Sequence, residues 1–257
     1  MSSAQILIAL YTMTRKEVTR IFRIWSQTLL PPIITTALYF LVFGTFLADR
    51  IGEVQGVGYA VFIIPGLIMM GVITNAFSNV ASVTYMSKFQ RNIEEVLVAP
   101  IPAWAVTLGF ASGGVVRGLI IALIIFLTTI FFVDIQVAHP IIAILAIFLT
   151  TLLFSFMGLV NGLFAKNFDS VTLIPTFVLT PLTYLGGVFY SADSLKGVWK
   201  TISHLNPIYH MVDLFRYGFI GEMSGNIWIG FGVLIGGIII FWSWGYMMIR
   251  NGRDLIG

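Results

Sequence analysis

The fold is decided by residues 54–87, VQGVGYAVFIIPGLIMMGVITNAFSNVASVTYMS, which contain no aspartate, glutamate, lysine or arginine. A helix needs about 20 apolar residues to cross roughly 30 Å of hydrocarbon, and this run is longer than that. Its only strong helix breaker is Pro65-Gly66, so one long or kinked helix is more economical than two short passes. We therefore expect a single membrane span over about residues 58–84.

Four further runs are equally free of charge: 24–48, 135–165, 170–192 and 223–249. A sixth candidate span, 103–133, is interrupted only by Arg117. Overall the chain is 58% hydrophobic and 10% charged, against about 25% charged residues in soluble domains. The sequence predicts one all-α integral membrane domain over 1–257, with six spans and a count open by one. The spans are expected at about 28–48, 58–84, 103–133, 141–164, 171–190 and 227–249.

The basic residues indicate the orientation of these spans. With a cytoplasmic N-terminus, nine basic residues lie inside and four outside, which satisfies the positive-inside rule with both termini cytoplasmic. The inner set is Arg15, Lys16, Arg20, Arg23, Lys88, Arg91, Lys166, Arg250 and Arg253, and the outer set is Arg50, Lys196, Lys200 and Arg216. The net charge of +3 is therefore interpreted as a topology signal and not as a sign of nucleic-acid binding.

Residues 3–25 precede the first span and show helical periodicity. Leu10, Thr14, Val18, Ile21 and Trp25 share one face, whereas Lys16, Arg20 and Arg23 lie on another. This pattern is typical of an interfacial helix whose apolar side enters the headgroup boundary. A solvated basic tail is the alternative.

A second amphipathic segment, residues 87–99, joins the second and third spans. Phe89, Ile93 and Leu97 recur at helical spacing, and Pro100 follows the segment. The charged side chains on its other side are Lys88, Arg91, Glu94 and Glu95. Such a face suits a soluble partner better than lipid, although a solvated connector has the same composition.

Residues 190–226 are too apolar for a free loop and too broken for a span, so short helices that dip back toward the membrane or lie on its outer surface are expected there. Small residues recur four apart at Gly109 and Gly113, Gly114 and Gly118, Gly158 and Gly162, and Gly232 and Gly236. Each pair would let two helix backbones approach closely.

The sequence lacks the machinery of an enzyme or a proton-coupled pump. There is no cysteine, no G-x-x-x-x-G-K-[ST] phosphate loop, no H-E-x-x-H, no G-x-S-x-G and no pair of intramembrane carboxylates. His139, His204 and His210 are not spaced like metal ligands. Arg117 has two interpretations: it lines a conduit, or it lies near the cytoplasmic end of a protruding helix. Energy for any uphill transport must come from a partner.

Three stretches, Pro181-Leu-Thr-Tyr-Leu-Gly-Gly-Val-Phe-Tyr, Leu205-Asn-Pro-Ile-Tyr-His and Arg216-Tyr-Gly, give the chain a recognisable pattern. The pattern resembles the signature of ABC-2 type transporter permeases, and the resemblance extends over nearly the whole chain. It is similar above all to nodulation-factor, polysaccharide and drug export permeases. The residues that carry the signature are Pro181, Gly186, Gly187, Asn206, Pro207 and Arg216.

The resemblance implies a half-transporter in the bacterial cytoplasmic (inner) membrane that pairs with a second copy of itself and with two copies of an ABC-type ATP-binding subunit. This chain would bind no cofactor and no nucleic acid, since ATP and Mg belong to the partner. Residues 87–99 would be the coupling helix, contacting the ATPase through Lys88, Phe89, Arg91, Ile93, Glu94, Glu95 and Leu97. Residues 3–25 would be the connecting helix and 191–206 the outer re-entrant helices. The conduit would be lined by Thr35, Tyr39, Phe43, Phe177 and Tyr184, with Arg117 as a candidate from its position alone.

The expected function is therefore export of a lipid, glycan or drug-like substrate, without enzymatic activity in this chain. Two alternatives stay open at this point. One is an intramembrane lipid- or glycan-modifying enzyme that uses Asp193, His204 and His210. The other is a non-transporting scaffold or immunity-type receptor, which would leave the outer hairpin unexplained.

Overall fold

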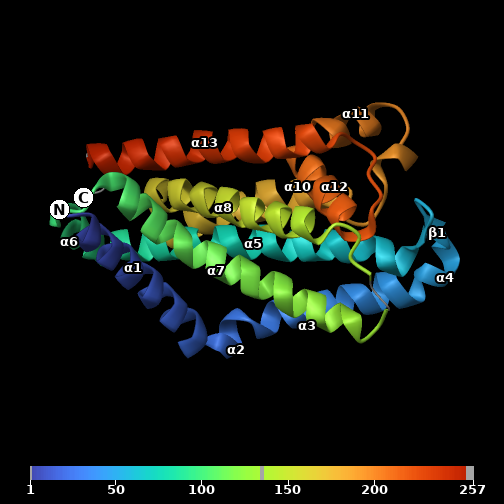
Figure 1. Ribbon diagram of the computed structural model, residues 1–257, viewed down its shortest axis with the longest axis horizontal. Coiled ribbons are helices and arrows are strands. Elements are labelled where there is room, and N and C mark those ends of the chain that lie inside the picture. The colour runs from blue at the N-terminus through green and yellow to red at the C-terminus, as the bar shows by residue number, and fades with distance from the viewer. Residues whose placement is uncertain (1, 134–135, 253–257) are drawn as a thin grey trace.

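The computed structural model describes residues 2–133 and 136–252, so Asp134 and Arg253 lie outside the described residues. Almost all of this part is helical, and the long helices run along the longest axis of the molecule (Figure 1). The helices are α1 (Ser3–Arg23), α2 (Trp25–Thr28), α3 (Leu30–Tyr39), η1 (Phe40–Phe46), α4 (Ala48–Ile51), α5 (Tyr59–Phe89), α6 (Asn92–Val98), α7 (Ala103–Ile130), α8 (Pro140–Phe164), α9 (Phe168–Ile174), η2 (Pro175–Leu179), α10 (Thr180–Tyr184), η3 (Ala192–Ser194), α11 (Val198–Leu205), α12 (Pro207–Ile220) and α13 (Ile227–Asn251). We call the end of the bundle with α6 the α6 end and the opposite end the α11 end.

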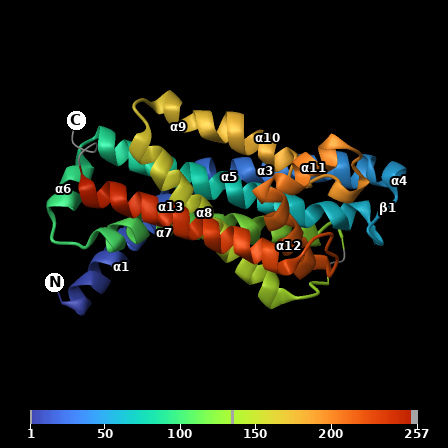
Figure 2. The same cartoon turned by 90° about the horizontal axis from the view of Figure 1, so that it is seen from above.

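Among the described residues, five helices are long and apolar enough to cross a membrane: Trp25–Phe46, Tyr59–Phe89, Ala103–Ile130, Pro140–Phe164 and Ile227–Asn251. These helices confirm the prediction of a helical membrane protein. The sixth expected span, 171–190, corresponds to three consecutive short helices, α9, η2 and α10. They contain 7, 5 and 5 residues. This shorter segment runs along the same axis as α5 (Figure 2), and the chain leaves it at Gly186-Gly187, where Gly187 has a φ of +74°.

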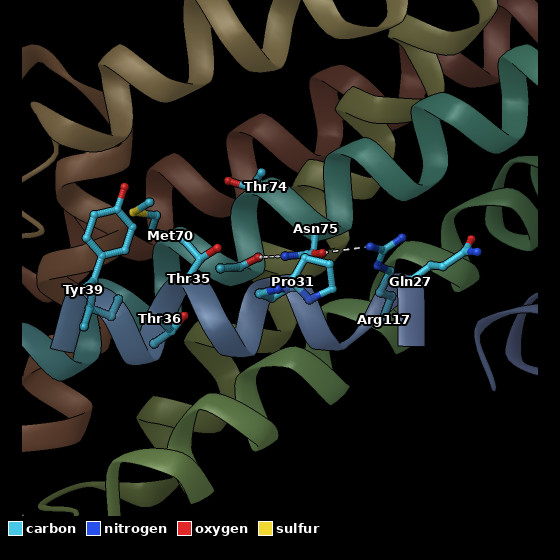
Figure 3. A pocket seen from close by; sticks show the side chains of 12 residues that line it. Gln27, Pro31, Thr35, Thr36, Tyr39, Met70, Thr74, Asn75 and Arg117 are labelled. Atoms are coloured by element: carbon cyan, nitrogen blue, oxygen red, sulfur yellow. Dashed lines mark hydrogen bonds between the residues drawn. The ribbon is translucent and has the colours of Figure 1, made fainter. Parts of the chain in front are cut away.

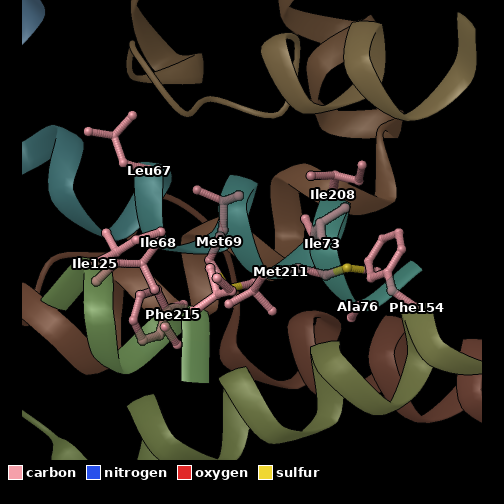
Figure 4. Close-up of a cluster of buried hydrophobic side chains, with 14 of the residues drawn as sticks. Leu67, Ile68, Met69, Ile73, Ala76, Ile125, Phe154, Ile208, Met211 and Phe215 are labelled. Carbon is pink, nitrogen blue, oxygen red and sulfur yellow. The ribbon is translucent and has the colours of Figure 1, made fainter. Parts of the chain in front are cut away.

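Helix α5 is the centre of the bundle. It is a single helix of 31 residues with Pro65 inside it, which confirms one pass in preference to two short ones. It packs on α7, α8 and α12, and side chains from all four helices interlock around Met69 and Ile73 (Figure 4). Buried residues make up 67% of its most apolar window, against 11% for α13. Helix α13 therefore has its apolar surface left for lipid or another chain.

Glycines decide how closely the helices approach α5. A Cβ added at Gly158 of α8 would lie 2.4 Å from the backbone oxygen of Phe77, and one at Gly114 of α7 would lie 2.8 Å from that of Ala76. Because backbone cannot move aside as a side chain can, these two contacts require glycine.

Helix α1 packs along α7 near the α6 end (Figure 1). Its Met13 and Glu17 side chains fill the space beside Gly109 and Gly113 of α7. This contact corrects the predicted membrane-facing side of residues 3–25, because Ile21 of that side is buried against protein. The exposed apolar side chains of α1 are Leu7, Ile8, Tyr11 and Phe22.

The sequence predicts one amphipathic helix over 87–99, and this prediction is wrong. Helix α5 continues to Phe89, and the chain turns at Gln90-Arg91 before α6 begins at Asn92. Arg91 has a φ of +61°, in the left-handed region that a helix interior cannot contain. The periodicity from Phe89 to Leu97 therefore spans two helices.

At the α11 end, β1 (Glu53–Val54) and β2 (Val57–Gly58) form a small antiparallel hairpin. Beyond the expected outer region 191–206, α12 returns into the bundle and packs on α5, α8 and α13. Arg216, counted from the sequence as an outer-loop charge, lies on α12 and is 1% exposed. That assignment is corrected, since its charge is inside the fold.

Candidate functional site

Three groups of predicted site residues occupy different parts of the bundle: α6 and its neighbours, a polar cluster around Arg117, and the contact between α10 and α12. The first group surrounds the short helix α6. Lys88, at the end of α5, donates a hydrogen bond from Nζ to the backbone oxygen of Leu163 at 3.0 Å, so it caps the end of α8. Ile93 is 1% exposed and packs in a small core with Val96 and Leu97. These apolar residues hold α6 on the bundle.

The outward side of α6 differs from its packed side. Glu95 is exposed, Glu94 is half-buried, and the large apolar side chains of Phe89 and Val98 are 71% and 85% exposed. Val98 was missed from the sequence because it does not share the periodicity of Ile93 and Leu97. An exposed pair of apolar side chains beside two carboxylates is typical of a protein-binding surface.

Two hollows flank α6. One, of about 310 Å³, lies toward the α8–α9 connection, and the other, of about 380 Å³, lies between α1, α6 and α7. Glu94 lines the first and Glu95 lines the second. The first hollow is lined by Tyr85, Lys88, Phe89, Arg91, Glu94, Ala165 and Lys166. The helix is thus a ridge between two grooves, and each groove has a carboxylate.

The second group is a polar cluster inside the bundle. Arg20 of α1 donates to Glu17 at 2.8 Å and to Oδ1 of Asn79 at 2.7 Å. Arg117 of α7 donates to Oδ1 of Asn75 at 3.0 Å, to the backbone oxygen of Thr28 at 3.3 Å and to Oδ1 of Asn79 at 3.4 Å. The guanidinium of Arg117 therefore faces protein groups from α2 and α5.

A cavity of about 280 Å³ adjoins Arg117 and lies between α3, α5 and α7 (Figure 3). The structure brings Thr35, Tyr39 and Arg117, three of the expected conduit residues, into its lining. The full lining is Gln27, Pro31, Pro32, Thr35, Thr36, Tyr39, Leu67, Met70, Gly71, Thr74, Asn75 and Arg117.

The remaining conduit candidates form or adjoin an aromatic cluster. The hydroxyl groups of Tyr39 and Tyr184 are 2.8 Å apart, which joins α3 to α10. Phe189, which was not predicted, packs on both tyrosines and on Phe43, with a ring-centroid distance of 4.6 Å to Phe43. Phe177 is separate from this cluster and is 72% exposed. Phe43 and Phe177 lie in π-helical turns, η1 and η2, a feature frequent at functional sites.

The third group, the signature residues, holds the end of α10 on α12. Asn206 caps α12 by accepting a hydrogen bond from the backbone nitrogen of Ile208 at 3.0 Å, and it donates to the backbone oxygen of Leu182 at 2.6 Å. Arg216 donates to the backbone oxygen of Gly187 at 2.6 Å and lies 4.1 Å above the Phe62 ring. Leu182 belongs to the last turn of α10, whose carbonyl groups need partners such as Asn206.

The other signature positions have local conformational roles. Pro207 lies in the first turn of α12, where a missing N–H costs nothing, whereas Pro181 lies one residue after the junction of η2 and α10 in a continuous helical segment. A Cβ at Gly186 would lie 2.9 Å from the Ile208 side chain. These contacts give the signature residues a structural role and place none of them in a chemical reaction.

Substituting Asn206 with alanine should lower the free energy of unfolding by about 1–2 kcal/mol, because both a helix cap and a contact to Leu182 are lost. The apparent melting temperature of the purified protein in detergent would show the loss. Asn226 is a matched control, since it caps α13 through Trp228 and its side chain makes no second hydrogen bond to the part of the chain that the structure describes. Asn226→Ala should lower the free energy of unfolding by less than Asn206→Ala does. An equal loss in the two variants would contradict the double role of Asn206 as a helix cap and as a donor to Leu182.

The residues of the enzyme alternative meet only in part. Asp193 pairs with Lys200 at 2.9 Å, and its other neighbour, His204, is 4.0 Å away. The hydrogen bond from the Lys200 side chain lowers the pKa of Asp193, so this carboxyl group is poorly suited to act as a general acid. A ring nitrogen of His210 contacts the backbone oxygen of His204 at 2.8 Å. Among residues 2–133 and 136–252, no three His, Asp or Glu side chains converge as metal ligands.

Comparison with known proteins gives an independent result. The family model described as "ABC-2 type transporter" matches residues 8–220. The chain is 50% identical to Inner membrane transport permease YadH of Escherichia coli (strain K12) over 248 residues, which are 96% of this chain and 97% of that protein. It is 26% identical to Nodulation protein J of Rhizobium leguminosarum bv. viciae over 232 residues, which are 82% of this chain and 83% of that protein. Nodulation protein J of Neorhizobium galegae is 23% identical over 220 residues, or 84% of each chain.

Proposed function

Because the chain belongs to the ABC-2 type transporter family and is a membrane permease subunit, we propose that it works as a homodimer with two copies of a separate ATP-binding subunit. The complex exports a lipid, glycan or drug-like substrate across the inner membrane. ATP and Mg bind to the partner. In this arrangement the α6 end is cytoplasmic, as are both termini.

The observation that carries this proposal is the surface of α6. The helix is held on the bundle by Ile93, and it presents Glu94, Glu95, Phe89 and Val98 between two grooves. A ridge of this kind can transmit motion of a soluble partner to α5, because Phe89 is the last residue of that central helix. The connecting helix α1 lies beside the same surface, since Lys16 and Thr12 line the second groove.

The segment α9–η2–α10 is proposed as the sixth span. It would line the export path together with Trp25–Phe46, which is only 22% buried in its most apolar window. Thr35, Tyr39, Phe43, Phe177 and Tyr184 lie on these two segments. The hydrogen bond between Tyr39 and Tyr184 would then close the path within one protomer, and its separation would open it.

The proposal is tested by identifying what co-purifies with the protein. An affinity tag inserted between Gln55 and Gly56, in the turn of the β1–β2 hairpin, lies at the α11 end and leaves the α6 end free. Gentle extraction from the native membrane followed by mass spectrometry should find an ABC-type ATPase in equal amount. A folded, dimeric chain with no nucleotide-binding partner would overturn the proposal.

A further inference from the structure

Arg117 is a cation without a carboxylate partner. Among the described residues, the nearby carboxylate of Glu17 is paired with Arg20, and no ion pair of Arg117 occurs. The acceptors of Arg117 are two side-chain amides and one backbone oxygen. The two guanidinium groups thus share the Asn79 side-chain oxygen, and the nearby carboxylate pairs with Arg20. A charge in a membrane-spanning helix is costly unless it is paired, so this site has an unmatched positive charge.

The Nε–H of Arg117 is buried and, in the part of the chain that the structure describes, lacks a hydrogen-bond acceptor. A guanidinium has five donors in a planar fork that matches a phosphate or a carboxylate. Buried donors without acceptors are uncommon and need an explanation. A bound anion in the cavity that Arg117 lines would supply the missing charge.

The cavity beside Arg117 has room for such a group and has two chemically different ends. Gln27, Asn75 and Arg117 gather at one end, and Met70 and Tyr39 lie toward the other (Figure 3). The volume of about 280 Å³ exceeds that needed by a small anion alone. Thr74 and Thr35 are exposed on its rim, although the surrounding part of α5 is mostly buried. The cavity therefore opens sideways and not toward either end of the bundle.

We propose that this cavity binds the phosphate of an amphipathic lipid, with Arg117 on the phosphate and the apolar end around the start of the acyl chain. Free phosphate shares the anionic chemistry, but it would leave the apolar end and the sideways opening without a role. The proposal deepens the proposed function by naming a substrate or regulatory class, an anionic lipid. It concerns this chain alone, so it can be tested without the ATPase.

Purified protein in a neutral detergent should be titrated with short-chain phosphatidylglycerol, short-chain phosphatidylcholine and inorganic phosphate, with bound molecules counted by native mass spectrometry. We expect phosphatidylglycerol to bind at least tenfold more tightly than either other probe. Equal binding of the two lipids would overturn the role of the charge. Phosphate binding as tight as that of phosphatidylglycerol would overturn the lipid assignment.

Variants connect the binding to this cavity. Arg117→Gln should weaken phosphatidylglycerol binding at least tenfold, and Arg117→Lys, which keeps the charge without the fork, should weaken it less. Arg23→Gln removes one charge from an exposed position of α1 and should leave binding unchanged. Thr74→Trp fills the cavity from its exposed rim with every charge retained, and it should abolish binding. Unchanged binding in Arg117→Gln or Thr74→Trp would overturn the site.

The lipid-binding experiment and the ATPase co-purification experiment can succeed or fail independently. Arg117→Gln protein that loses lipid binding and still co-purifies with an ATPase supports both conclusions. Selective, Arg117-dependent lipid binding by a chain that never recruits an ATPase supports the site and contradicts the transporter assembly.

Discussion

Replacing Gly158 with alanine is expected to destabilise the protein by about 1–3 kcal/mol, although only one methyl group is added. The new Cβ would lie 2.4 Å from the backbone oxygen of Phe77 and 3.2 Å from the backbone nitrogen of Ala81. Both atoms belong to α5, the central helix, so relief requires α8 to move away from the core. The cost of lost packing exceeds the roughly 1 kcal/mol that alanine gains over glycine in a helix.

Gly232→Ala is the matched control. Gly232 also lies within a long helix, α13, and apart from its own chain neighbours and the adjacent helix backbone no described atom lies within 4 Å of a Cβ built there. This variant should be as stable as the original protein or slightly more stable. Thermal unfolding in one detergent, followed by tryptophan fluorescence, compares the two variants. A melting temperature of Gly158→Ala equal to that of Gly232→Ala would show that α8 is not packed on α5 as described.

These two glycines also show what the sequence can and cannot predict. Gly158 and Gly162 have the same spacing as Gly232 and Gly236, and the spacing alone ranks the two pairs equally. The structure separates them, because the first pair faces Phe77 and Ala81 of α5 whereas the second faces open space. Spacing predicts that two backbones can approach, and only the tertiary arrangement decides whether they do.

The five long apolar helices were predictable because charge-free runs have a length that the bilayer fixes. The packing of α12 inside the bundle was not predictable: a helix of 14 residues is too short for that signal, and the sequence indicates only short helices that dip back toward the membrane or lie on its surface. The contacts of the buried Arg216 of α12 with the Gly187 backbone oxygen and the Phe62 ring join residues that lie far apart in sequence. The turn at Arg91 was missed for a related reason: apolar periodicity continues across it, and nothing in the sequence marks the left-handed residue.

Two residues of the candidate sites, Phe189 and Val98, could not be predicted because their positions depend on the tertiary arrangement. Phe189 joins Tyr39, Phe43 and Tyr184 only because the chain reverses at Gly187. Val98 is exposed because α6 buries Ile93 and Leu97 on its other side. Neither residue belongs to a motif, so a three-dimensional arrangement was needed to identify it.

Charge reversal on α6, Glu94→Lys with Glu95→Lys, is expected to reduce recovery of the partner ATPase and transport-coupled ATP hydrolysis at least tenfold. The two carboxylates line separate grooves beside the same ridge, so the double change alters both sides of the proposed docking surface. Like charges placed in an interface cost several kcal/mol, and truncation of buried charged pairs costs about 2–5 kcal/mol. Within residues 2–133 and 136–252 neither side chain forms an ion pair, so the variant should keep its melting temperature.

The control for this variant carries the same charge change at the opposite end. Glu53 on β1 and Glu222 between α12 and α13 are exposed. Strand β1 and the α12–α13 connection lie near the α11 end (Figure 1), so Glu53→Lys with Glu222→Lys should recover the ATPase normally. ATPase recovery by pull-down and ATP turnover in reconstituted liposomes should be measured at several salt concentrations, because surface electrostatic effects weaken with salt. Full ATPase recovery and turnover by the Glu94/Glu95 variant would exclude α6 as the coupling element. Coupling would then have to pass through α1, whose Lys16 lines the second groove.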